Sequence, residues 1–97
     1  MHDPLDGPVM LEVTFVLPRP AKHYLPVTKK RTEPVLRSDA PSWHTSKPDA
    51  TKLLRALEDS LKGIAWADDS QVASQAVTKR YSDDGRTGAL VRISALP

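Results

Sequence analysis

The fold of this chain is decided by one stretch, residues 49–63, which reads DATKLLRALEDSLKG. Four leucines recur there at the spacing that places them on one face of an α-helix, and they are Leu53, Leu54, Leu57 and Leu61. Asp49 is a typical N-cap residue, and Gly63 is a typical C-terminal stop. The pattern therefore predicts a main helix over residues 49–62 whose leucine face packs against another layer.

Strand-like stretches lie on both sides of this helix. Residues 8–17, 72–81 and 89–96 have the alternation or the β-branched content of strands with one buried face. Between the last two, residues 83–88 (DDGRTG) carry a hairpin-type turn signal, which predicts that these two strands pair. The order strand, long loop, helix, strand, strand predicts an α+β fold in which one principal helix packs on a small sheet of about three to four strands.

Length and composition limit the class of protein. The chain has 97 residues, enough for a single domain over residues 1–97. It has no cysteine, which excludes disulfide scaffolds, zinc knuckles, iron–sulfur sites and thiol nucleophiles. No apolar run approaches the ~20 residues that span a bilayer, and the N-terminus lacks the pattern of a signal peptide. We therefore expect a cytoplasmic protein without a membrane partner.

Residues 18–48 form a long, proline-rich loop with no clean period. Loops of this length without secondary structure are commonly functional or disordered. Eight basic residues stand against three acidic ones over residues 18–52, whereas residues 53–72 hold four acidic and two basic residues. This asymmetry favours an anionic partner held beside an acidic site, but a solvated loop beside an ordinary helix explains it as well.

Three aspartates stand at the two ends of the helix, with Asp49 before it and Asp68 and Asp69 after it. They converge only if the chain doubles back and residues 64–66 run antiparallel alongside the helix. Converging carboxylate oxygens would suit Mg²⁺ or Mn²⁺. An N-cap and a polar turn explain the same residues without a metal, so both interpretations stay open at this point.

Two cations lie one turn into the helix. Lys52 and Arg55 would neutralise the charge that builds up on a phosphate bound beside these aspartates. Arg55 can equally form an ordinary surface ion pair with Asp59, four residues further along the helix. The two roles predict different surroundings for Arg55, which a structure can distinguish.

Residues 47–63 (KPDATKLLRALEDSLKG) and 66–72 (WADDSQV) together resemble the RusA-type Holliday junction resolvases, which are endodeoxyribonucleases of phages and prophages. In that family an Asp-x-Asp-Asn-Leu motif opens a helix that ends in Asp-(Ala/Ser)-Leu-x-Gly. An aromatic residue and an Asp-Asp-(Ser/Ala)-Gln-Val motif follow. Several fixed spacings agree at once over about 26 residues of this chain.

The resemblance implies a homodimeric endonuclease that depends on Mg²⁺, or on Mn²⁺, and resolves four-way DNA junctions by paired symmetric nicks. It implies that branched DNA and a second copy of the chain are the partners, in the cytoplasm of a bacterial host. The implied metal ligands are Asp49, Asp68 and Asp69. The implied catalytic residues are Asp49, Lys52, Arg55 and Asp69.

The chain departs from the family pattern at several places. Thr51 stands where the second aspartate is usual, which removes a negative charge and should weaken metal affinity. Arg55 replaces a lysine, and a guanidinium binds phosphate but cannot shuttle a proton. Lys52 replaces an asparagine. Family members usually have a strand, a loop and a helix before the strand that residues 8–17 match. Because that strand begins almost at the N-terminus here, we expect this N-terminal element to be missing. These departures keep an alternative open, a catalytically impaired relative that still binds branched DNA.

With this resemblance, the basic loop gains a role in gripping DNA. The residues expected to contact phosphates are Lys29, Lys30, Arg31, Arg37 and Lys47. Tyr24, Trp43 and His44 are candidates for stacking on an unpaired base, although a tryptophan such as Trp43 is more often an anchor for its own loop. Trp66 is expected in the core, because the apolar stretch before Asp68 must pack against the leucine face.

Overall fold

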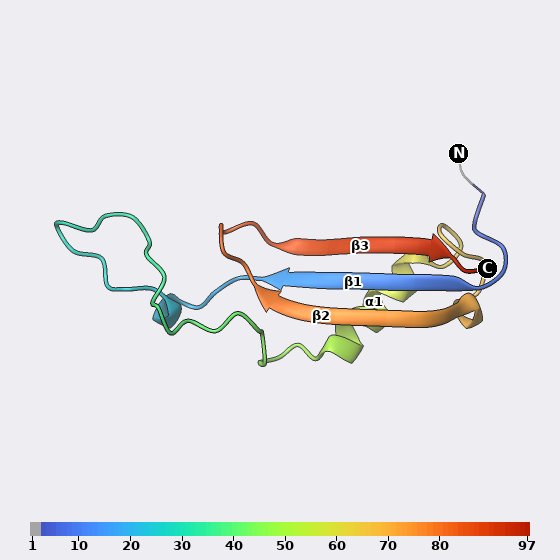
Figure 1. Ribbon diagram of the computed structural model, residues 1–97, viewed down its shortest axis with the longest axis horizontal. Helices are drawn as coiled ribbons and strands as arrows, with labels where there is room; N and C mark the ends of the chain where they lie inside the picture. Colours follow the sequence, from blue (N-terminus) through green and yellow to red (C-terminus); the bar gives the residue numbers. More distant parts are fainter. Residues whose placement is uncertain (1–2) are drawn as a thin grey trace.

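The computed structural model describes residues 3–97. Its elements in chain order are β1 (Val9–Leu17), η1 (Ala21–His23), α1 (Ala50–Leu61), η2 (Asp69–Gln71), β2 (Val72–Tyr81) and β3 (Gly88–Ala95). The helix covers one face of a three-stranded sheet, and no described element covers the opposite face (Figure 1). The predicted α+β class, with one main helix on a small sheet, is confirmed. No helix within residues 3–97 is long and apolar enough to cross a membrane.

The sheet is mixed, and its strand order is β2-β1-β3. β1 pairs in parallel with β2 and antiparallel with β3. The predicted pairing of the last two strands across residues 83–88 is therefore wrong. The connection from β1 through α1 to β2 is a crossover that lays β2 parallel to β1, so the other edge of β1 is the one left for β3.

The core lies between β1 and the helix. Its buried side chains come from one face of β1, from the helix and from the turn after it, and they are Val9, Leu11, Val13, Phe15, Leu54 and Trp66. Trp66 is 0% exposed, which confirms its predicted place in the core. The alternation of β1 explains the arrangement, because residues two apart share a face of the sheet.

Residues 18–48 form an arm that extends beyond the end of the sheet (Figure 1). The radius of gyration is 17.6 Å, whereas about 12–13 Å is expected for a compact chain of this length. The arm is a narrow ribbon rather than a structureless loop, because Tyr24 and Leu36 form an antiparallel bridge and the Leu25 N–H donates to the Val35 carbonyl at 2.7 Å.

A buried arginine fixes the base of the arm to the sheet. The side chain of Arg19 is only 3% exposed. It donates to the carbonyls of Ser82 and Pro41, both at 2.7 Å, and pairs with Asp83 at 3.0 Å. The returning segment adds a second attachment, because the Tyr81 N–H donates to the Ser42 carbonyl at 2.9 Å. The arm therefore leaves the sheet in a defined direction.

Candidate active site

A groove of about 290 Å³ runs between α1 and the first half of β2. Its lining is mostly polar and consists of Thr51, Leu54, Arg55, Glu58, Asp59, Asp69 and Gln75. Thr51, Arg55 and Glu58 share one side of the helix because they are four and three residues apart. The leucine face turns the helix toward the sheet, and this leaves the polar side at its margin, facing Asp69.

Asp69 is held in place by the core. The indole Nε1 of the fully buried Trp66 donates a hydrogen bond of 2.9 Å to Asp69 Oδ1. A hydrogen bond to a charged acceptor from a fixed donor orients the carboxylate at the groove. The sequence spacing of an aromatic residue three positions before the aspartate thus has a structural reason.

Asp68, directly before Asp69, has a different task. Its Oδ1 accepts from the Ser70 N–H at 2.9 Å, and Gln71 Oε1 accepts from the Asp68 N–H at the same distance. These two bonds form a capping box around η2. The hydrogen bond from the Ser70 backbone lowers the pKa of Asp68 below its usual value. The Asp-Asp-Ser-Gln sequence therefore builds the turn that presents Asp69.

Besides Asp59, the groove holds one more acidic residue to which the sequence analysis gave no role in a site, and this is Glu58. It is half-buried, and burial raises its pKa, with further contributions from the charges of Asp69 and Asp59. Arg55 opposes this rise. The signal was present in the helix period, since Glu58 lies seven residues after Thr51, about two turns along the same side. Gln75, on β2, was missed as well.

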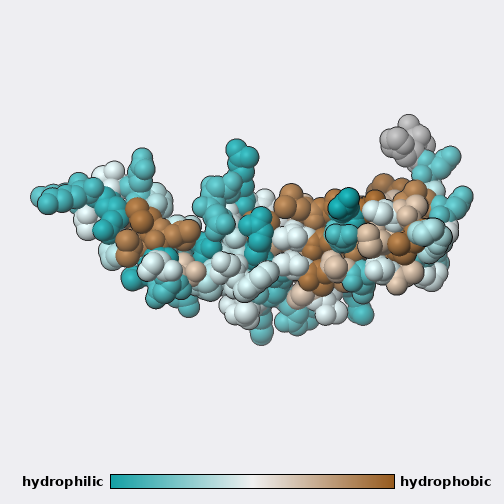
Figure 2. Space-filling model, in the orientation of Figure 1, coloured by the Kyte–Doolittle hydropathy of each residue, from teal (hydrophilic) through white to brown (hydrophobic). Residues whose placement is uncertain are grey.

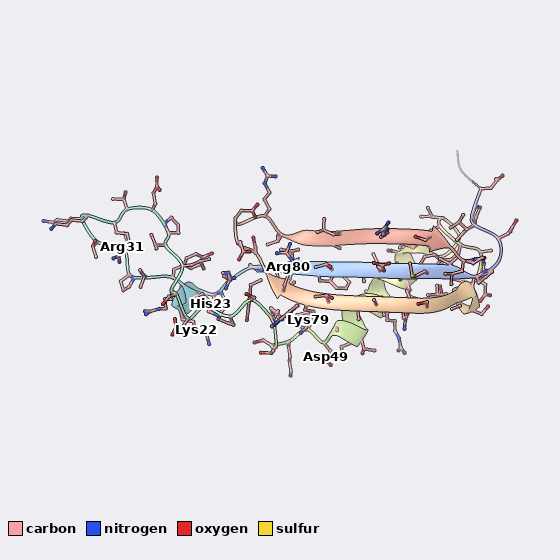
Figure 3. All side chains as sticks on the ribbon, in the orientation of Figure 1. Lys22, His23, Arg31, Asp49, Lys79 and Arg80 are labelled. Carbon is pink, nitrogen blue, oxygen red and sulfur yellow. The ribbon has the colours of Figure 1, made fainter. Side chains whose placement is uncertain are left out.

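The three predicted metal aspartates are not gathered. Among the described residues there is no group of three or more His, Cys, Asp or Glu side chains placed to hold a metal ion. Asp49 is the N-cap of α1, as predicted, although its side chain makes no capping hydrogen bond. It lies at the end of α1 nearest the arm, whereas η2 lies at the far end of the sheet (Figures 1 and 3).

The separation of these aspartates follows from the turn after the helix. The expectation that residues 64–66 run back along the helix is wrong, because the chain turns tightly at the helix end. The Ile64 and Ala65 N–H groups both donate to the Leu61 carbonyl, at 2.9 and 2.8 Å, and the Gly63 N–H donates to the Trp66 carbonyl at 2.6 Å. Gly63 has a φ of +83°, which suits glycine. The turn leaves Asp69 beside Glu58 in the groove, which Asp49 does not line.

The predicted DNA-binding residues are spread along the arm. Lys29 and Lys30 are exposed at its far turn, where Thr28 and Arg31 exchange backbone hydrogen bonds of 2.9 and 3.1 Å. Two of the guanidinium groups help to hold the ribbon, since Arg31 donates to the Pro26 carbonyl and Arg37 to the Lys22 carbonyl. Lys47 is exposed in the segment that leads into α1. The lysines are therefore the cations with the greater freedom to meet a phosphate.

The three candidate stacking residues have separate environments. His44 packs its ring on Tyr81, with centroids 4.9 Å apart. Trp43 is 65% exposed and bridges to Arg80 on β2, whereas Tyr24 lies in the ribbon. The structure thus places Trp43 and His44 together at the base of the arm and Tyr24 further out.

Comparisons with known proteins agree with this picture. The family model described as endodeoxyribonuclease RusA matches residues 1–94. The uncharacterized protein YqaN of Bacillus subtilis (strain 168) is 30% identical over 88 residues, which are 91% of this chain and 59% of that protein. The chain thus spans less than two thirds of the length of that relative. No solved structure matches the chain significantly.

Proposed function

The chain belongs to the RusA endodeoxyribonuclease family, and on that premise we propose that it resolves four-way (Holliday) DNA junctions. In this proposal a homodimer makes paired symmetric nicks with the help of Mg²⁺, or of Mn²⁺, during recombination or repair of phage-type DNA. Two-fold symmetry suits the substrate because one dimer meets two equivalent strands of the junction.

The observation that carries the proposal is the groove between α1 and β2. It brings Thr51, Arg55 and Asp69 together from segments that are separate in sequence. These are three of the positions at which the family motif places its working residues. A cation, a hydroxyl and an oriented carboxylate facing one space can bind a phosphodiester and direct an attack on it.

The cations of the helix bind the scissile phosphate in this scheme. Arg55 lines the groove and offers planar, paired donors to phosphate oxygens. Lys52 is exposed on the first turns of the same helix and adds a mobile positive charge. Cations placed there stabilise the negative charge that develops on the phosphoryl oxygens.

The groove suits a hard divalent ion only in part. Mg²⁺ in phosphoryl-transfer sites is commonly held by one or two carboxylates together with substrate phosphates and water. Asp69 and Glu58 supply two carboxylates, and repulsion between them contributes to the raised pKa of Glu58. An ion bound there would polarise the phosphate and make a bound water more acidic.

The two other aspartates that the sequence singles out, Asp68 and Asp49, have supporting roles in this proposal. Asp68 holds Asp69 at the groove through the capping box, and we propose that it contributes negative charge at the rim rather than a direct ligand. Asp49 stands two residues before Thr51, at the end of the helix where the strand of DNA would enter. In-line attack of water at phosphorus would break the bond to the 3′-oxygen and leave a 5′-phosphate.

The arm grips the substrate in this proposal. A two-stranded ribbon fits a major groove of DNA, and Lys29 and Lys30 at its far turn would contact phosphates there. Arg31, Arg37 and Lys47 would add charge along its length. Binding through these residues should weaken steeply as the salt concentration rises.

The test uses a synthetic four-way junction at low salt, with Mg²⁺ or with EDTA. Wild type should give paired symmetric nicks that need the metal, and Asp69→Asn and Glu58→Gln should abolish or strongly reduce them. Glu33→Gln removes an exposed carboxylate on the arm and serves as the control that retains cleavage. Equal cleavage by wild type and Asp69→Asn would refute the assignment of the groove.

A second candidate function is binding without cleavage. It is favoured by Thr51 and by the finding that, in the part of the chain that the structure describes, no three carboxylate or histidine groups are placed to hold a metal. It predicts salt-sensitive binding of the junction that does not require Mg²⁺ and that produces no nicks. Sedimentation of the same samples tests the homodimer in either case.

A further inference from the structure

A second cleft lies at the base of the arm, away from the groove. This basal cleft has a volume of about 550 Å³, which is in the range of small-molecule sites. The residues that matter for its chemistry are Arg19, Lys22, His23, His44, Ser46 and Tyr81. They come from the end of β1, from η1, from the segment that leads to α1 and from the end of β2, so the cleft exists only because the arm is fixed to the sheet.

The charged side chains that line the basal cleft are cations. Arg19 and Lys22 line it, and no aspartate or glutamate is among the described residues of its lining. The effect is visible on His23, whose pKa is lowered by burial and then by the charges of Arg19 and Lys22. Asp83 pairs with Arg19 but is itself largely exposed outside the cleft. An anion is therefore the charge that the cleft attracts.

The cleft also holds unused hydrogen-bonding capacity. Nδ1 of His44 is buried and has no hydrogen-bond partner within residues 3–97. Because this atom is closed off from solvent, a ligand in the cleft does not reach it in this arrangement, and His44 contributes to the cleft through the rest of its ring. The hydroxyls of Ser46 and Tyr81 line the same space. The aromatic wall is firm, because His23 packs edge-on against Tyr81 at 4.6 Å and His44 packs at 4.9 Å.

The distance between the basal cleft and the groove determines which phosphate of a bound DNA strand could reach the cleft. Gln75 lines the groove and Tyr81 lines the cleft, and both are on β2. Six residues of a strand span about 20 Å. One strand of DNA advances about 3.4 Å per nucleotide along the helix axis, and its phosphates also wind around that axis. The span therefore corresponds to a few nucleotides, fewer than about six. Figure 3 shows Lys22 and His23 at the arm base near the end of β2 that carries Lys79 and Arg80.

We propose that the basal cleft binds a phosphate of a DNA strand a few nucleotides from the phosphate held in the groove. Lys22 is the mobile cation that pairs with this phosphate, and the Ser46 hydroxyl donates a hydrogen bond to it. Arg19, already paired with Asp83 and bonded to the carbonyls of Ser82 and Pro41, holds the wall of the cleft in place. The spacing rests on the proposed function, whereas the binding of a nucleotide phosphate in the cleft does not. The site would fix the register of a strand between the arm and the groove.

The first experiment measures binding without chemistry. The full chain is titrated in EDTA with inorganic phosphate, with thymidine 5′-monophosphate and with a short single-stranded oligonucleotide, while the ring signals of its histidines are followed by NMR. The oligonucleotide should shift His23 and His44 and should compete with the two smaller probes. Absence of any shift at these two rings overturns the proposal, and saturation by inorganic phosphate that the oligonucleotide cannot displace overturns its assignment to DNA.

The second experiment places the phosphate on the junction. Each phosphate within about six nucleotides of the nick is replaced in turn by a neutral methylphosphonate, and affinity is compared for wild type, Lys22→Gln and the control Lys30→Gln at the tip of the arm. At one of these positions the neutral link should weaken wild type and Lys30→Gln several-fold and should leave Lys22→Gln nearly unchanged. Equal losses in all three proteins at every position overturn the proposal.

The two proposals can fail separately. If the cleft binds nucleotide phosphate but no junction is cut, the nuclease assignment fails and the cleft remains. If junctions are cut normally by Lys22→Gln and no ring signal responds, the cleft assignment fails and the nuclease remains.

Discussion

The hydrogen bond from Trp66 to Asp69 links the core to the groove, and its removal can be predicted in detail. Trp66→Phe keeps a buried aromatic ring but deletes the Nε1–H donor that lies 2.9 Å from Asp69 Oδ1. A hydrogen bond to a charged group is worth roughly 1.5–3 kcal/mol, and the lower half applies because Asp69 is only half-buried. The smaller ring leaves a void that adds about 1 kcal/mol.

The expected loss in the free energy of unfolding is therefore about 2–3 kcal/mol. For a chain of this size it corresponds to a fall in melting temperature of roughly 10–20 °C, at about 4–8 °C per kcal/mol. Urea denaturation followed by circular dichroism measures it directly. Cleavage should also fall, at a temperature where the variant is fully folded, because Asp69 is no longer oriented.

The matched comparison is Asp69→Asn, which retains an oxygen that can accept from Trp66. It should lose cleavage but less than about 1 kcal/mol of stability, since the neutral acceptor still pairs with the indole. The double variant should be less destabilised than the sum of the two single changes. If Trp66→Phe loses less than 1 kcal/mol, or if the two changes are additive, the hydrogen bond does not couple the core to the groove.

Three further predictions concern the arm and the histidines. Arg19→Ala should loosen the base of the arm. Backbone hydrogen exchange at residues 42–44 should become faster, and junction affinity should fall roughly tenfold. Unchanged exchange would contradict the anchoring role of the Arg19 bonds to the Ser82 and Pro41 carbonyls. Replacing Lys29 and Lys30 together by alanine should lower the slope of log affinity against log salt by about two, at roughly 0.9 per phosphate contact, and an unchanged slope would place the DNA elsewhere. Burial, and after it the charge of nearby cations, lowers the pKa of His23 and His44 below 6.5, so the folded state favours the neutral rings. Their contribution to stability is therefore complete above about pH 6.5 and is lost as the pH falls below that value. The urea midpoint should be lower at pH 5.5 than at pH 7.5, and equal midpoints would show that neither ring titrates differently on unfolding.

The main helix was predictable because its signals are local. Four leucines on one face, an N-cap and a terminal glycine all fall within residues 49–63, and the observed helix is Ala50–Leu61. The burial of Trp66 followed from the same local argument. The capping box of Asp68 and Gln71 is also local, although the Asp-x-x-Gln pattern was interpreted only as a polar turn.

The strand pairing was not predictable from the turn signal alone. The sequence of residues 83–88 permits a hairpin, and Gly85 does adopt a positive φ of 83°. The crossover through α1 had already placed β2 in parallel beside β1, and this long-range constraint outweighs a turn preference. No single stretch of the sequence indicates that the first strand lies in the centre of the sheet.

The groove was predicted in part. Arg55 and Asp69 do share one space, but Asp49 and Asp68 do not line it, because the turn at Gly63 is tighter than the proposed return of the chain. Glu58 lines the groove because it lies three residues after Arg55, on the same side of the helix. The basal cleft depends on contacts between residues more than thirty positions apart, such as Lys79 with the Ser46 carbonyl, and no local pattern could reveal it.

The central position of β1 has a consequence for biogenesis. β1 ends at Leu17, yet the first strand that pairs with it begins at Val72 and the second at Gly88. A ribosome that adds about 5–20 residues per second needs roughly 3–11 seconds to make the intervening chain. During that time the stretch VMLEVTFVL is an apolar, β-prone segment without a partner, which is the kind of segment that aggregates. Speed of translation and chaperone supply should therefore affect the yield of this protein.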